Sequence, residues 1–186
     1  LYAKNFDGKI LSYPNDKNLS NKGMMNEGAA STLLGMKGIP AIAEELMVAR
    51  DIQLCEYCET GMHFSAISTA GSVALIRAAK ERGLAVTADI SAHQIVLDDN
   101  ALEQFDTNLK VKPPLRSKED IEALIEGLID DTIDAIASDH TPEDIENKAV
   151  EFEIAAHGII GLESAFAVID NRLKDKLSLE QIVDKF

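Results

Sequence analysis

Four short apolar segments, each followed by polar or turn-forming residues, predict four β-strands. They cover residues 8–13, 62–68, 84–90 and 133–138. The first segment ends at Pro14-Asn15-Asp16, and buried strands commonly end in such turn residues. The chain therefore carries four candidate strands, separated by longer segments.

The longer segments between these strands carry apolar residues at helical spacing. Residues 40–61 begin with Pro40, whose missing N–H costs nothing in the first turn of a helix. Residues 72–82 have an apolar face and stop before a glycine, the expected C-terminal cap. Ser117 opens a capping-box-like start for a helix over residues 117–128. We therefore predict a helix in each of these three segments.

Alternation of strand and helix is typical of a parallel sheet with helical crossovers. The fold class is α/β, either an open doubly wound sheet or part of a (β/α)8 barrel, and four units are half of such a barrel. No linker rich in Gly, Ser or Pro divides the chain, so residues 1–186 are expected to belong to one domain. The chain opens at Leu1 and stops at Phe186 within a helix-like pattern. We expect this domain to be truncated at both ends.

Composition and charge restrict the possible functions of the chain but do not change the predicted fold. Of the 186 residues, 46% are hydrophobic, and 32 acidic residues against 18 Lys and Arg give a net charge of −14. This charge argues against a nucleic-acid backbone or an anionic membrane surface as partner. No apolar run approaches the ~20 residues that span a bilayer, and two cysteines do not make a disulfide scaffold. We expect a soluble, cytoplasmic protein.

Residues that follow the strands are the first candidates for chemistry, because parallel α/β folds collect binding groups there. Asp139 and His140 follow the fourth predicted strand. Asp139 is either a metal ligand or base for water, or a cap of the next turn, and its spacing leaves both roles open. His93, at a strand end, is a better functional candidate than His63, which we expect to pack or hydrogen-bond structurally.

Three further features lie outside the strand ends. Cys55 and Cys58 have the spacing of a zinc or redox pair, but they fall inside a predicted helix, where packing is expected. Lys112-Pro113-Pro114-Leu115-Arg116 is a rigid loop. Its Arg116 is an ion-pair partner or an anion ligand, and we favour the structural role. The glycines of Gly158-Ile159-Ile160-Gly161-Leu162-Glu163 allow close backbone approach to a ligand.

Six motifs connect the chain to one enzyme family. They are Met24-Met25-Asn26-Glu27-Gly28, Ala43-Glu44-Glu45 with Ala49-Arg50-Asp51, Ile67-Ser68-Thr69, Lys112-Pro113-Pro114-Leu115-Arg116, Ala137-Ser138-Asp139-His140-Thr141-Pro142, and Gly158-Ile159-Ile160-Gly161-Leu162-Glu163. In this order and at these intervals the chain resembles the dihydroorotases of the amidohydrolase superfamily. The resemblance implies an amidohydrolase-type (β/α)8 barrel, of which this chain would be the C-terminal half, strands five to eight.

The resemblance also implies an activity and a set of site residues. The family hydrolyses the ring amide of dihydroorotate, or closes it from N-carbamoyl aspartate, in pyrimidine biosynthesis. Its zinc ions polarise the amide and generate hydroxide, and an aspartate after strand eight moves the proton. By resemblance Asp139 is this catalytic aspartate and a metal ligand, and Lys112, Glu143 and Gly158 occupy substrate-binding positions. The family's His-x-His pair and its bridging carboxylate or modified lysine would precede Leu1, so this chain alone is predicted to be inactive.

Four positions depart from the family pattern. Tyr13 and Ala66 stand where the family has two histidine ligands to zinc, and neither a neutral phenol nor a methyl group replaces an imidazole. Lys112 replaces an asparagine near the substrate, and Glu143 replaces a histidine that contacts it.

Two functions follow, and the sequence leaves both open. In the first, the full-length protein is a dihydroorotase or related cyclic amidohydrolase with an altered or single-metal zinc site and a small-molecule substrate. In the second, it is a catalytically silent dihydroorotase-like subunit that stabilises a partner, as inactive family members do for aspartate transcarbamoylase. A homo-oligomer is the other expected assembly. An intact His-x-His pair before Leu1 would favour the enzyme.

Overall fold

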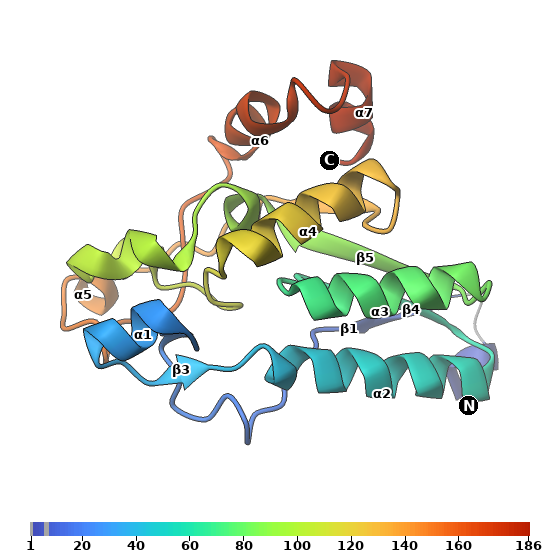
Figure 1. Cartoon of the computed structure of the whole chain (residues 1–186), viewed down its shortest axis with the longest axis horizontal. Helices are drawn as coiled ribbons and strands as arrows, with labels where there is room; N and C mark the ends of the chain where they lie inside the picture. The colour runs from blue at the N-terminus through green and yellow to red at the C-terminus, as the bar shows by residue number, and fades with distance from the viewer. Residues whose placement is uncertain (1, 6–7) are drawn as a thin grey trace.

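The computed structural model describes residues 2–5 and 8–186, and a four-stranded parallel sheet lies at its centre (Figure 1). The strands are β1 (Lys9–Ser12), β4 (Gly61–Phe64), β5 (Val86–Ser91) and β6 (Ala135–Ala137), in the order β1-β4-β5-β6. Because all four are parallel, they end at one edge of the sheet, where residues from different strands come together.

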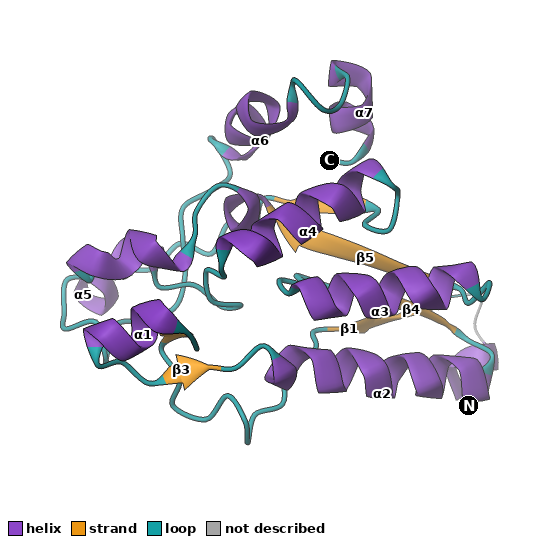
Figure 2. Ribbon diagram, viewed as in Figure 1, coloured by secondary structure: helices purple, strands orange, loops and turns teal. Residues whose placement is uncertain are grey.

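Three helices cover one face of this sheet. Helices α2 (Ile42–Cys58), α3 (Ala70–Glu81) and α4 (Lys118–Ile129) lie side by side, each between two consecutive strands of the sheet (Figure 2). Apolar side chains of both layers fill the space between them, among them Val48, Ile52, Met62, Phe64, Val73, Ile76, Ile90, Leu124, Leu128 and Ile136. Burial of these side chains is the main force holding helices to sheet.

The opposite face of the sheet carries polar side chains. The imidazole of His63 lies between Thr87 and Asp89, with Nδ1 2.9 Å from Thr87 Oγ1 and Nε2 2.8 Å from Asp89 Oδ2. Lys9 Nζ donates to the same Thr87 hydroxyl at 3.3 Å. Side chains alternate between the two faces of a strand, so these residues stand between the core positions. His63 therefore has the structural hydrogen bonds that the sequence predicts.

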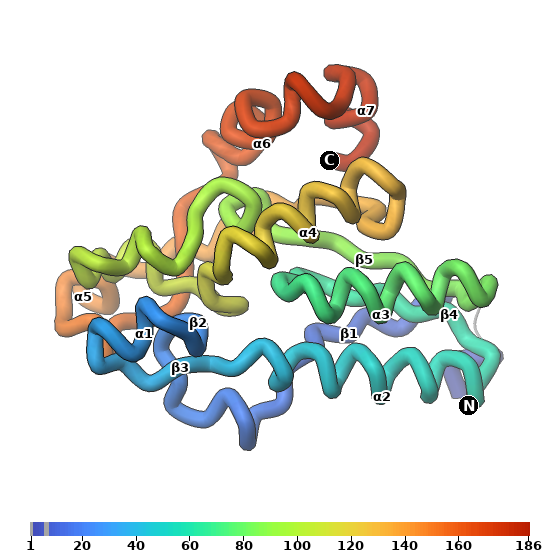
Figure 3. The backbone as a smooth tube through the Cα atoms, in the orientation of Figure 1, coloured from blue at the N-terminus to red at the C-terminus, as the bar shows by residue number. Residues whose placement is uncertain are grey.

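A layer of loops lies beyond the ends of the strands. Two short strands, β2 (Met25–Asn26) and β3 (Gly38–Ile39), pair in parallel there and flank helix α1 (Ala29–Leu34). The 3-10 helix η3 (Asp99–Gln104) packs beside α1, although about seventy residues separate them (Figure 3). The remaining elements are η1 (Tyr2–Asn5), η2 (Ala92–Ile95), η4 (Thr107–Leu109), α5 (Ile145–Lys148), α6 (Ala165–Leu173) and α7 (Leu179–Asp184).

Arg116 joins this loop layer to α2 and to the segment between β4 and α3. Its Nε donates to Ser68 Oγ at 2.9 Å, and its Nη1 donates to Asn26 Oδ1 and Ile39 O, both at 3.0 Å. Its Nη2 lies 3.7 Å from Glu44 Oε2, and 1% of the arginine is exposed. A buried guanidinium whose donors are used within the protein is structural, so the structural interpretation of Arg116 is confirmed.

The predicted strands and helices are present, but the second and fourth strands are clearly shorter than predicted, the fourth covering Ala135–Ala137 instead of residues 133–138. The second strand ends at Phe64 rather than at residue 68. Ala66 has a φ of 55°, and its amide donates to Asp89 Oδ1 at 2.7 Å, so the chain turns away from the sheet there. Cys55 lies in α2 and its thiol donates to the carbonyl of Thr60, as expected for a helical packing residue. Within the described residues, no helix has the length and apolar character needed to cross a membrane.

Candidate active site

Asp139 lies directly beyond β6, at the edge where the strands end. Its φ is 47°, a left-handed conformation that aspartate adopts more readily than most residues. Its Oδ2 accepts a hydrogen bond from Ser91 Oγ at 2.8 Å. The carboxylate is thus oriented by the last residue of the neighbouring strand β5 and stays partly open to solvent.

His93 is the second group at this position. Its Nε2 lies 3.9 Å from Asp139 Oδ2, too far for a hydrogen bond, and 7% of the residue is exposed. Neither ring nitrogen has a hydrogen-bond partner among the described residues. Burial lowers the pKa of His93, and the nearby charge of Asp139 opposes this shift. The structure thus brings His93 beside Asp139, where the sequence analysis favoured a functional histidine.

Tyr13 follows β1 and lies at the same edge of the sheet. Its pKa is raised well above the usual range, first by desolvation and then by the negative charges of Glu44 and Asp139, while Arg116 acts in the opposite direction. The phenol therefore stays protonated at neutral pH. A protonated hydroxyl is a hydrogen-bond donor and a poor zinc ligand.

Ala66 occupies the turn after β4, and its side chain is a methyl group. The carboxylate nearest its backbone, that of Asp89, already accepts from the Ala66 amide and lies within hydrogen-bond distance of His63 Nε2. No metal-binding side chain stands at residue 66 itself. The Asp89 carboxylate is already used to hold the turn through its hydrogen bond from the Ala66 amide.

A zinc ion needs about three protein ligands that converge on one point. Among residues 2–5 and 8–186, no group of three or more His, Cys, Asp or Glu side chains is placed to hold a metal ion. Asp139 has one histidine in reach, and Tyr13 and Ala66 add no ligand. The side chains of this chain do not, by themselves, fit a zinc site.

The three residues predicted to bind substrate lie in loops beside the strand ends. Glu143 and Gly158 line one cavity of about 180 Å³, while Lys112 is exposed in the proline loop and does not line it. Gly158 has a φ of 156°, and a Cβ there would lie 2.3 Å from the carbonyl oxygen of Thr141. Only glycine fits this position. The substrate-binding roles of these residues stay predictions.

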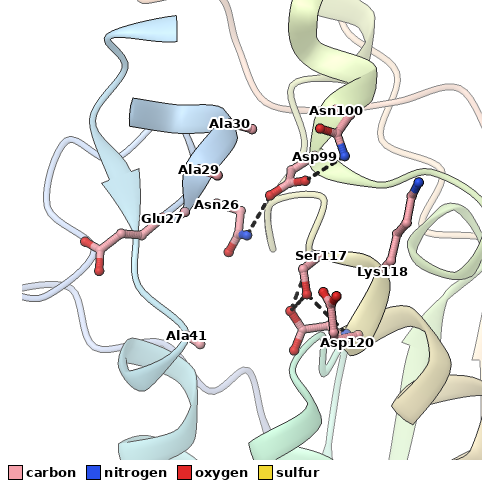
Figure 4. Close-up of a pocket in the computed structure, with 12 residues that line it drawn as sticks. Asn26, Glu27, Ala29, Ala30, Ala41, Asp99, Asn100, Ser117, Lys118 and Asp120 are labelled. Carbon is pink, nitrogen blue, oxygen red and sulfur yellow. Dashed lines mark hydrogen bonds between the residues drawn. The ribbon is translucent and has the colours of Figure 1, made fainter. Parts of the chain in front are cut away.

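A larger cavity, of about 420 Å³, lies between α1, η3 and the start of α4 (Figure 4). Its polar groups pair with one another: Asn26 Nδ2 donates to Asp99 Oδ2 at 2.9 Å, and Ser117 Oγ donates to Asp120 Oδ2 at 3.0 Å. Sequence analysis did not find this cavity, because its walls come from segments far apart in the chain. Asp139 does not line it, so we place the candidate active site at the strand ends instead.

Comparison with known proteins was made at the levels of family, sequence and structure. A family model described as "Dihydro-orotase-like" matches residues 2–72. The chain is 49% identical over 185 residues to a dihydroorotase of Thermoanaerobacter sp. (strain X514), with 98% of this chain and 43% of the relative covered. It is 50% identical over 185 residues to a dihydroorotase of Syntrophobacter fumaroxidans, with 99% and 42% covered.

Solved structures of the same fold share less sequence. The D-hydantoinase (dihydropyrimidinase) from Thermus sp. superposes with a TM-score of 0.81 at 20% identity, covering 97% of this chain and 42% of that protein. The L-hydantoinase from Arthrobacter aurescens gives a TM-score of 0.81 at 22% identity, covering 98% and 42%. The predicted fold class, a partial amidohydrolase-type (β/α)8 barrel, is thereby confirmed.

The chain matches only part of the length of its relatives. Its described strands form a four-stranded parallel sheet, and it spans 43% of the Thermoanaerobacter relative at close to half identity. We conclude that the chain belongs to the dihydroorotase-like family and corresponds to a C-terminal part of its curated members.

Proposed function

We propose that the full-length protein is a dihydroorotase-like barrel of pyrimidine biosynthesis in the cytoplasm, and that this half of the barrel is catalytically silent and structural. Its partner would be aspartate transcarbamoylase or a second copy of the protein. The whole of residues 1–186 would be one part of a single barrel domain.

The chemistry at two ligand positions carries this proposal. Tyr13 is a protonated phenol and Ala66 a methyl group, where the family resemblance places two imidazoles. Zinc-dependent hydrolysis requires a metal ion that several protein donors hold, because only the bound metal activates the attacking water. Loss of two donors in the same half of the barrel is hard to offset from the other half.

A second candidate function is cyclic amide hydrolysis at an altered or single-metal site. The observation that favours it is the placement of Asp139, whose carboxylate is oriented by Ser91 Oγ at 2.8 Å beside the buried ring of His93. In this case Asp139 would move the proton and, with zinc present, serve as a ligand. Lys112, Glu143 and Gly158 would contact dihydroorotate or N-carbamoyl aspartate.

Metal content and dihydroorotate hydrolysis of the full-length protein separate the two functions. Under the first proposal, elemental analysis finds no zinc after incubation with zinc and dialysis, and no turnover is detected. About one or two zinc ions per chain together with turnover would overturn it and support the altered enzyme.

The variant Asp139→Asn sharpens the comparison. If the second function holds, loss of the proton-transferring carboxylate lowers kcat by roughly 100-fold or more. The exposed Asp175→Asn, outside the strand ends, serves as the matched control and leaves turnover unchanged. Equal activity of Asp139→Asn and wild type would remove Asp139 from the reaction.

A further inference from the structure

Residues 144–154, which include α5, form a loop at the left end of the molecule in Figure 1. We call this segment the acidic loop. It carries four exposed acidic side chains: Asp144, Glu146, Glu151 and Glu153. None of their carboxylates forms an ion pair within the described part of the chain. The only basic residue of the loop, Lys148, is buried. The outer surface of the acidic loop is therefore negatively charged, with no positive charge of its own to balance it.

Two buried lysines hold the backbone of the acidic loop. Lys110 Nζ donates to three carbonyl oxygens at the end of the loop, at 2.7–2.9 Å. Lys148 Nζ donates to three carbonyl oxygens of the flanking segments, at 2.6–2.9 Å. Phe152 anchors the loop from below, in a small core with Met25 and Leu102. A loop that is already held in one shape loses little conformational freedom when it binds a partner.

Apolar side chains lie among the charges of the acidic loop. Ile145 and Ile154 are 75% and 69% exposed. A single exposed apolar residue is ordinary, but here two belong to one short loop whose backbone is fixed. Burial of both under a partner would remove apolar area from water. The loop therefore offers a partner two kinds of contact, one electrostatic and one apolar.

The charge of the loop restricts the kind of partner. Nucleic-acid backbones and anionic membrane surfaces carry negative charge and are repelled. A second copy is also disfavoured, because a chain with a net charge of −14 has few basic patches to place against this loop. The surface that fits is that of another protein, with basic side chains around an apolar recess.

We propose that the acidic loop is the docking surface for a partner protein that presents lysine or arginine side chains around an apolar recess. Ile145 and Ile154 would enter the recess, and the four carboxylates would pair with its basic rim. This role rests on the structural function proposed above and specifies the chemistry of the partner. Such a contact forms faster at low ionic strength, where charges attract over longer distances.

Binding of a labelled amphipathic peptide of lysine and leucine to the full-length protein, followed by fluorescence anisotropy, tests the proposal. The loop variant combines Glu151→Gln, Glu153→Gln and Ile154→Ser. It removes two charges and one apolar side chain but keeps every backbone bond to Lys110. It should weaken peptide binding by at least about tenfold. Ile145→Lys, at a separate point of the loop, should also weaken binding and serves as the second variant if the first folds poorly.

A matched control removes the same number of charges and one apolar side chain from exposed positions of α7. It combines Leu179→Ser, Glu180→Gln and Asp184→Asn. Because it has the same net charge as the loop variant, it should bind the peptide within about twofold of wild type. Amide hydrogen exchange of the wild-type protein should slow in residues 144–154 when the peptide is bound.

Several results would overturn the proposal. They are absence of peptide binding, equal loss of affinity in the loop and α7 variants, slowed exchange only outside the loop, and equally tight binding of an oligolysine that lacks leucine. A change of oligomeric state in the loop variant, measured by sedimentation, would make the occupant a second copy instead. Zinc content and dihydroorotate turnover are measured on the same samples. Zinc-dependent turnover would contradict the structural function without changing the binding result, so the two failures are distinguishable.

Discussion

The buried carboxylate of Glu44 accepts four hydrogen bonds at once. Its oxygens accept hydrogen bonds from the backbone amides of Ser68 and Thr69, at 2.9 and 3.1 Å, and from the hydroxyls of the same two residues. The carboxylate also lies next to the guanidinium of Arg116. The acid joins α2 to the start of α3 and balances an arginine that is itself 1% exposed. Glu44 therefore contributes to stability through tertiary contacts that its position in the sequence does not reveal.

We therefore expect Glu44→Ala to destabilise the protein severely. The change leaves the Arg116 charge and the Ser68 and Thr69 donors without partners, a loss of about 3–5 kcal/mol in the free energy of unfolding. The matched control is Glu122→Ala, which removes two exposed ion pairs, with Arg172 and Lys176, and should cost less than about 1 kcal/mol. Urea unfolding of the full-length protein measures both, and equal effects would contradict the structural role given to Glu44.

His157 provides a prediction on pH. Desolvation, followed by the charges of Lys110, Lys112 and Lys148, lowers its pKa from 6.5 to about 4. Between these values the unfolded chain binds a proton that the folded protein does not, so the folded state loses stability as pH falls from about 6.5 to about 4. His157→Gln should reduce this pH-dependent loss in the free energy of unfolding by on the order of 2 kcal/mol. The check is urea unfolding at pH 7 and pH 4.5, and parallel profiles of variant and wild type would show that His157 is not responsible.

At the scale of elements, the packing of α4 depends on a glycine within the helix. A Cβ at Gly127 would lie 2.8 Å from Ile133 Cδ1 and 3.1 Å from Val73 Cγ1, and both neighbours are fully buried. Glycine lowers helix propensity by up to about 1 kcal/mol relative to alanine. Because residue 127 has no side chain, α4 can lie this close to its neighbours.

Gly127→Ala is therefore expected to destabilise the protein by about 1 kcal/mol, because overpacking of about 1–3 kcal/mol exceeds the gain in helix propensity. Glu126→Ala, on the exposed side of the same turn, is the control and should change stability by less than about 0.5 kcal/mol. Thermal unfolding of both variants is the measurement. A rise in Tm for Gly127→Ala would mean that α4 shifts freely.

Elements with a clear hydrophobic period could be predicted, and those defined by distant contacts could not. The pattern locates β5 and α4 because each buries one face against a layer next to it. Strands β2 and β3 have two residues each, too few for any period, and their position depends on Arg116 about ninety residues away from Asn26. The pairing of loop layer and barrel is a tertiary effect with no local signal.

The same limit applies to the candidate site. The position of Asp139 at a strand end was predictable, since it depends only on where β6 stops. Its neighbours were not: Ser91 and His93 meet it because β5 and β6 are adjacent and parallel, with Ser91 opposite Ala137 in register. The raised pKa of Tyr13 likewise follows from tertiary structure, first from burial of the phenol and then from the carboxylates of Glu44 and Asp139, which other elements contribute.

At the scale of the whole molecule, the described residues form an arc of four strands whose face away from the helices is open to solvent at β1. Leu11 stands opposite His63 in register, on that polar face, and 76% of it is exposed. Solved proteins with this fold are more than twice as long, since the chain covers 42% of the Thermus D-hydantoinase. Closure of a barrel buries the inward side chains of every strand.

Leu11 therefore tests whether the full-length protein closes this arc into a barrel. Leu33, on α1, is 82% exposed, so the structure of this chain alone gives the two leucines nearly equal exposure. If the barrel closes, Leu11→Lys buries an unpaired charge and should lower the free energy of unfolding by at least about 3 kcal/mol. Leu33→Lys should change it by less than about 0.5 kcal/mol. Urea unfolding of the two full-length variants distinguishes these cases. Equally small effects would mean that the inner face of β1 remains open to water, and that the rest of the protein folds as a separate unit rather than completing this sheet.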